Sequence, residues 1–175
     1  MDSTSTAKTN NIATGLIKEL EQEAAVTRKV LERIPADKFD WKPHEKSMTM
    51  GRLATHVAEM HGWTKPTVDD LELDFAKMDY KPFEPKTTEE LVAHLDKNVN
   101  EAIETLKNAS DEAWFDDWSL RNGEQVYFTI PKIAVMRGMV LNHIVHHRGQ
   151  LSVYLRLNDI PVPAMYGPSA DEGQM

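Results

Sequence analysis

The segment Met139-Val-Leu-Asn-His-Ile-Val-His-His-Arg-Gly-Gln150 combines a helical pattern with a polar interruption of that pattern. Steps of three and four residues through this region follow one seam of a helix, of the kind that faces the core of a bundle. The seam contains Ile133, Met136, Val140, His143, His147, Gln150, Tyr154 and Leu157. Two histidines and a glutamine therefore stand where leucine or valine is expected. Burying them without partners costs roughly 1–3 kcal/mol each, so we expect the core to supply a partner.

Four segments have apolar residues at helical spacing, and together they predict an all-α four-helix bundle. The segments are residues 12–34, residues 49–63, a stretch that begins at Thr87, and residues 130–158. Thr87 and Glu90 have the spacing of a capping box, in which each side chain accepts a backbone N–H of the other residue.

Two connections between these helices are unusual. Residues 64–86 form a long link, for which we predict a short helix near residues 68–75. Residues 118–128 contain Asn122-Gly123 between strand-type residues, which predicts a β-hairpin with a type I′ turn, because both central positions of that turn need positive φ. We expect this small hairpin to pack at one end of the bundle, before the last helix.

Length and composition suit a single compact domain. The chain has 175 residues, 28 of them acidic and 20 basic, with a net charge of −8. We expect a disordered leader over residues 1–11 and one bundle domain over residues 12–170. The leader lacks the basic start and apolar middle of a secretory signal, and no apolar run approaches the roughly 20 residues of a membrane span. These features predict a cytoplasmic protein with no membrane partner.

The composition also excludes several kinds of chemistry. The chain contains no cysteine, so disulfides, thiolate metal sites and cysteine nucleophiles are ruled out. The negative charge argues against nucleic acid as a partner, because the sequence-independent part of such binding comes from Lys and Arg on phosphates.

Three histidines are candidate ligands for one divalent metal ion. His143 and His147 are four residues apart and stack on one face of a helix, and His56 lies among apolar residues of the second helix. Three imidazoles suit zinc, nickel, copper or ferrous iron. They also leave coordination positions open, which is typical of catalytic rather than structural zinc.

The other polar residues near this pattern have simpler explanations. His61 lies roughly 140° around the helix from His56, so we expect it at the surface, together with His44 and His94; His146 falls at the edge or in solvent. Glu59 could approach the metal from the second helix, but we expect it to be solvated. For Arg148 a surface salt bridge is as good an explanation as any other. Gln150 either orients a ligand or a bound water, or pairs with a backbone group.

With these residues in place, the sequence resembles the DinB-like (damage-inducible, YfiT-like) superfamily of metal-binding four-helix bundles. The match rests on Thr55-His-Val-Ala58 and on His143-Ile-Val-His-His-Arg-Gly-Gln150, with support from Pro161-Val-Pro163 and Tyr166-Gly-Pro-Ser169. The resemblance covers residues 12–170. One departure is Ile144, where many relatives carry an acidic residue that is not a ligand.

The resemblance implies an up-down-down-up, left-handed bundle, often a homodimer, with His56, His143 and His147 as ligands of zinc or nickel. Members of known activity include S-transferases that use low-molecular-weight thiols and a mycothiol-dependent isomerase, while others are described only as metal-dependent hydrolases.

We therefore expect an enzyme whose metal activates a low-molecular-weight thiol or water for reaction with a small-molecule substrate. The alternative is a non-catalytic metal- or ligand-binding module of a stress response, and a third possibility is a metal-free core of hydrogen-bonded histidines. The sequence identifies no general base.

Overall fold

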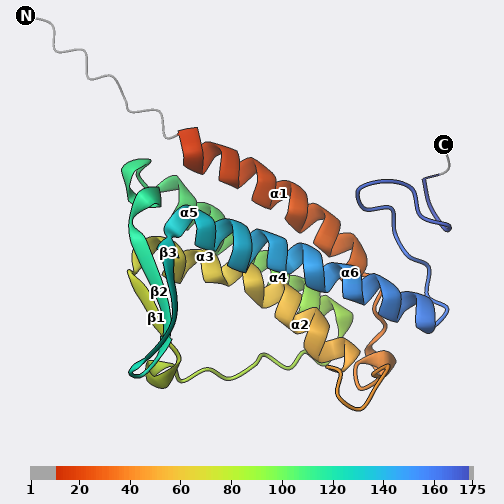
Figure 1. Cartoon of the computed structure of the whole chain (residues 1–175). Helices are drawn as coiled ribbons and strands as arrows, with labels where there is room; N and C mark the ends of the chain where they lie inside the picture. Colours follow the sequence, from red (N-terminus) through yellow and green to blue (C-terminus); the bar gives the residue numbers. More distant parts are fainter. Residues whose placement is uncertain (1–10, 174–175) are drawn as a thin grey trace, which may run out of the picture.

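The computed structural model describes residues 11–173, and its four long helices form the predicted bundle. These helices are α1 (Asn11–Leu31), α2 (Met50–Met60), α4 (Thr88–Lys107) and α6 (Asn142–Leu157). In Figure 1, α1 and α6 run in one direction and α2 and α4 in the other, which is the up-down-down-up arrangement. The leader predicted over residues 1–11 lies outside the described residues except for Asn11, which begins α1.

Hydroxyl side chains define where the middle helices begin. The Thr49 Oγ1 accepts the backbone N–H of Arg52 at 3.2 Å, and Thr87 Oγ1 accepts that of Glu90 at 3.2 Å. The carboxylate of Glu90 accepts the N–H of Lys86 at 2.7 Å instead of that of Thr87. Half of the predicted capping box is therefore present, and the other half is shifted by one residue.

The fourth helical segment is interrupted by a π-helical turn. It consists of α5 (Lys132–Val135), a π-helix over Met136–Leu141, and α6. A π turn holds more residues than an α turn, so the buried face shifts along the sequence after this point. Ile144, Arg148 and Leu151 are fully buried, whereas Gln150 and Leu157 of the predicted seam are exposed. The prediction of one continuous seam was wrong because it assumed a uniform α-helical period.

The predicted hairpin is part of a three-stranded sheet that packs across one end of the bundle (Figure 1). Strands β2 (Asp117–Asn122) and β3 (Gln125–Pro131) pair antiparallel, and β1 (Glu72–Asp74) adds in parallel to β2. The link itself contains α3 (Thr64–Asp69), then β1, and then a 3₁₀ turn over Phe75–Lys77. The short helix predicted near residues 68–75 thus ends earlier than expected.

The hairpin turn differs from the prediction by one residue. The two loop residues are Gly123 and Glu124, and Gly123 has a φ of +60° while Asn122 does not have positive φ. Positive φ at only the first central position matches a type II′ turn rather than type I′. Glycine at that position explains how the chain adopts this conformation without strain.

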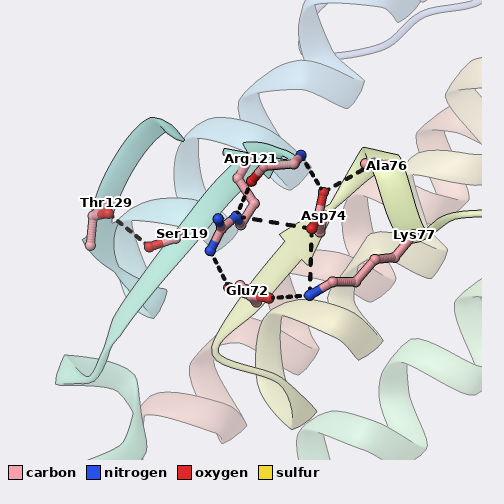
Figure 2. A network of polar contacts seen from close by, with 8 residues as sticks. Glu72, Asp74, Ala76, Lys77, Ser119, Arg121 and Thr129 are labelled. Atoms are coloured by element: carbon pink, nitrogen blue, oxygen red, sulfur yellow. Dashed lines mark hydrogen bonds and ion pairs between the residues drawn. The ribbon is translucent and has the colours of Figure 1, made fainter. Parts of the chain in front are cut away.

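A polar cluster ties the link to the hairpin turn (Figure 2). The Asp74 carboxylate accepts the backbone N–H groups of Gly123 at 2.8 Å and Ala76 at 3.0 Å. Glu72 accepts hydrogen bonds from Lys77 at 3.0 Å and from Arg121 at 3.2 Å. The Gly123 N–H is the main cause of a lowered pKa for Asp74. This Asp74 cluster fixes the 3₁₀ turn that immediately follows β1.

A buried ion pair connects α6 to α1. Arg148 is 1% exposed and donates to the Glu23 carboxylate at 2.5 Å and to the Glu23 carbonyl and Thr27 Oγ1 at 3.0 Å each. The Tyr166 hydroxyl contacts Arg148 and donates to Glu23 at 2.6 Å. Arg148 is therefore an interior residue, and its interpretation as a surface salt bridge was wrong. Within residues 11–173, no helix is both long and apolar enough to cross a lipid bilayer.

Candidate metal centre

The structure brings His56 of α2 together with His143 and His147 of α6. Their ring centroids are 5.2 Å apart for His56 and His143, 4.8 Å for His56 and His147, and 4.6 Å for His143 and His147. One ring nitrogen from each lies within 4.8 Å of the others, and all three side chains are half-buried. This spacing is compatible with shared coordination of one ion.

Hydrogen bonds set the tautomers of the two α6 histidines. His143 Nδ1 lies 3.3 Å from the Met139 carbonyl oxygen, and His147 Nδ1 lies 2.7 Å from Gln150 Oε1. Since both oxygens only accept, each Nδ1 carries the proton and each Nε2 keeps its lone pair free. Metal-binding histidines are commonly oriented in this way through their second ring nitrogen.

The surroundings keep the three imidazoles neutral. Burial, followed by the neighbouring His147 and His143, lowers the pKa of His56 to about 4. Burial is also the main cause of the lowered pKa values of His143 and His147. Histidine must be unprotonated to bind a metal, so at neutral pH these groups are already in the binding form.

A cavity of about 320 Å³ lies beside His56. It is lined by residues of α2, of the 3₁₀ turn that follows it and of the link, namely Arg52, His56, Glu59, Trp63, Phe75, Met78 and Tyr80. A volume of this size is at the lower end of the range for small-molecule sites. The histidine cluster is therefore next to a space that could hold a small ligand.

Glu59 holds the link over this cavity. Its carboxylate accepts hydrogen bonds from Arg52 at 3.1 Å, from the Tyr80 hydroxyl at 2.7 Å and from the Phe83 backbone N–H at 3.1 Å. The Glu59 side chain is only 11% exposed, so the prediction of a solvated glutamate was wrong. The link covers it, which helical periodicity within α2 does not reveal.

The remaining histidines divide into exposed and buried ones. His44 and His146 are exposed, as predicted. His94 is half-buried and stacks on Phe83 at a ring distance of 4.3 Å, and His61 is fully buried. Both were expected at the surface. His61 begins a 3₁₀ turn after α2, where the angle of 100° per residue no longer applies. His94 lies in α4 and is covered by Phe83 of the link.

Comparison with known proteins identifies the family of this chain. The sequence profile of the DinB family matches residues 6–174. The chain belongs to the DinB family. A curated relative, the uncharacterized protein YrdA of Bacillus subtilis, is 24% identical over 156 residues, which is 89% of each chain.

Two solved DinB-like proteins share the fold. One, from Bacillus cereus, superposes with a TM-score of 0.65 at 22% identity and covers 87% of this chain and 97% of its own. The other, YjoA of Bacillus subtilis, has a TM-score of 0.67 at 16% identity and covers 92% and 99%. At these low sequence identities, the structural similarity shows a shared fold only.

In this DinB-family chain, His61 should make stability depend on pH. Burial lowers the pKa of His61 to about 4, below its value in the unfolded chain, so the unfolded state binds the proton more readily. Stability is then fully present above about pH 6.5 and is lost as the pH falls toward 4. We expect the His61 contribution to fall by about 2 kcal/mol between pH 7.5 and 5.

The variant His61→Leu should remove that part of the pH dependence, because leucine does not titrate. It should also raise stability at pH 5, because neither ring nitrogen of His61 has a hydrogen-bond partner of normal geometry among the described residues. Urea unfolding of wild type and His61→Leu at pH 7.5 and 5, with a chelator present, measures the difference. Equal pH dependence in the two proteins would contradict this assignment.

Proposed function

We propose that His56, His143 and His147 bind one zinc or nickel ion and that the protein is a metal-dependent enzyme acting on a small molecule. The single observation that carries the proposal is the meeting of three neutral half-buried imidazoles beside a cavity. Membership of the DinB family supports it. The expected reaction is attack on the substrate by a low-molecular-weight thiol or by water, in which the nucleophile loses its proton and displaces a leaving group.

The donor set fits such an ion. Nε2 of His143 and of His147 is unprotonated and oriented by the bonds that Nδ1 makes to Met139 and Gln150. When bound, a divalent ion supplies Lewis acidity, which lowers the pKa of a coordinated thiol or water. Three protein ligands leave room for that nucleophile.

The residues around the cavity have roles in binding and positioning. The link shields one side of the site from water, because Glu59 holds Tyr80 and the backbone of Phe83 against α2. Gln150 keeps the His147 ring in place and also contacts His146 at 3.2 Å. Glu59 is engaged by three donors, so we assign it to holding the link rather than to accepting a proton from the substrate.

The first test is metal content followed by activity. Protein made without a histidine tag should contain about one equivalent of zinc or nickel by plasma mass spectrometry. The loaded protein should accelerate the reaction of monobromobimane with at least one common cellular thiol, or hydrolysis of a p-nitrophenyl ester, by roughly tenfold or more. Chelation should abolish the acceleration and the same ion should restore it.

Two results would argue against the proposal. Failure to bind zinc or nickel at neutral pH would remove its basis and leave a core of buried histidines. Stoichiometric metal without turnover of any thiol or ester would favour a non-catalytic binding module.

A further inference from the structure

The cavity beside His56 has an aromatic and apolar wall, formed by Trp63, Phe75 and Met78. Trp63 and Phe75 meet edge to face with ring centroids 6.4 Å apart, and Met78 lies beside them in the lining. Phe75 is 40% and Met78 37% exposed, so part of each apolar side chain faces the cavity rather than the core. Aromatic rings and methionine sulfur make favourable contacts with another aromatic ring.

This wall is held in place before any ligand binds. Phe75 follows Asp74, whose carboxylate accepts the backbone N–H groups of Ala76 in the link and Gly123 in the hairpin turn, and Figure 2 shows the bond to Ala76. At the other end of the wall, Tyr80 is bonded to Glu59 and Arg52. A preformed wall loses less conformational entropy on binding than a mobile one.

The charges of the lining cancel one another. Arg52 and Glu59 of the lining form an ion pair, with Nη1 and Oε2 3.1 Å apart. The Tyr80 hydroxyl bonds to both of them. An anionic ligand would meet the Glu59 carboxylate and a cationic one the Arg52 guanidinium. The side chains of the lining therefore offer no unpaired charge of their own with which to select an ion.

The volume indicates how much of an occupant the cavity can surround. A water molecule takes up about 30 Å³ in the liquid, so a cavity of about 320 Å³ holds about ten non-hydrogen atoms. We propose that the substrate is an uncharged aromatic compound of about this size, whose ring lies against Trp63, Phe75 and Met78. That its reacting group points toward the three histidines follows only from the function proposed above. The binding of its ring to the wall is independent of that function.

The proposal is tested with three fluorinated probes of nearly equal size that differ in charge. These are 4-fluorobenzamide, 4-fluorobenzoate and 4-fluorobenzylamine, and their dissociation constants are measured by fluorine NMR titration of the full chain. The titrations use protein as purified and protein treated with a chelator, since benzoate can also bind a metal directly. We expect the neutral amide to bind at least about fivefold more tightly than either ion in the chelated protein.

Variants of the wall residues test whether the probes bind in this cavity or elsewhere on the protein. Phe75→Ala should weaken amide binding about fivefold, whereas Phe115→Ala, which removes a 68% exposed phenylalanine that does not line the cavity, should not change it. Met78→Asp should shift the preference toward the benzylamine by adding an unpaired carboxylate. Its partly exposed position makes this change compatible with folding.

The outcomes distinguish this proposal from the metal function. Preferred amide binding that depends on Phe75 in the chelated protein supports the aromatic site even if no metal-dependent turnover is found. Preference for a charged probe, absence of binding by all three, or insensitivity to Phe75→Ala and Met78→Asp would overturn it, whatever the metal content.

Discussion

The variant His147→Ala is expected to lower zinc or nickel affinity by at least about 100-fold. The substitution removes one of three ligands and leaves two imidazoles, His56 and His143, at a ring distance of 5.2 Å. It also releases Gln150, whose Oε1 lies 2.7 Å from His147 Nδ1. Competition with a chromophoric chelator measures the affinity, and plasma mass spectrometry measures the metal that remains after purification.

Two further variants make this result specific. Gln150→Ala keeps all three ligands but removes the bond that orients His147, so we expect a smaller loss of roughly tenfold. His44→Ala removes an exposed histidine outside the cluster and should bind metal like wild type. Equal affinity in wild type and His147→Ala would show that the three histidines do not form the metal site.

The second large effect is expected for Arg148→Met, which should lower the free energy of unfolding by about 3–5 kcal/mol. The change leaves the Glu23 carboxylate, 11% exposed, without the cation that lies 2.5 Å away. It also removes donors from the Glu23 carbonyl and from Thr27. Urea unfolding with a chelator present separates this loss from any effect on the adjacent His147.

A second ion pair between α1 and the fourth helical segment provides the matched control. Arg137 pairs with Glu19, but their side chains are 55% and 36% exposed, and such surface pairs contribute at most about 1 kcal/mol. Arg137→Met should therefore have little effect. The double variant Glu23→Leu with Arg148→Met should recover part of the loss, because it removes both buried charges. Similar losses for Arg137→Met and Arg148→Met would contradict the assignment of Arg148 as an interior ion.

The sequence predicts the helices and the hairpin because both leave local signals. Apolar residues recur at helical spacing in α1 and α4, and Thr87 caps the N-terminus of α4, as its hydroxyl and spacing predicted. Gly123, which lies between two strand-type segments, likewise predicted the hairpin. The location of these elements follows from patterns within about ten residues of chain.

The missed features depend on contacts between distant segments. Strand β1 has three residues, too few for an alternating pattern, and exists because it pairs with β2 about 45 residues later. The π-helical turn before α6 shifts which residues are buried, so Ile144 and Arg148 face the core while His143 and His147 lie at its edge. The covering of Glu59 arises from the link and cannot be derived from α2 alone.

The direction of α2 and α4 has an evolutionary consequence. Because the two helices run the same way, the chain between them must return along the whole bundle, and Figure 1 shows this crossover. The crossover supplies Trp63, Phe75, Met78 and Tyr80 to the cavity, while the histidines come from the helices. Mutation of the crossover can therefore change what fits beside the histidines without disturbing them, so that new specificities arise on an unchanged scaffold.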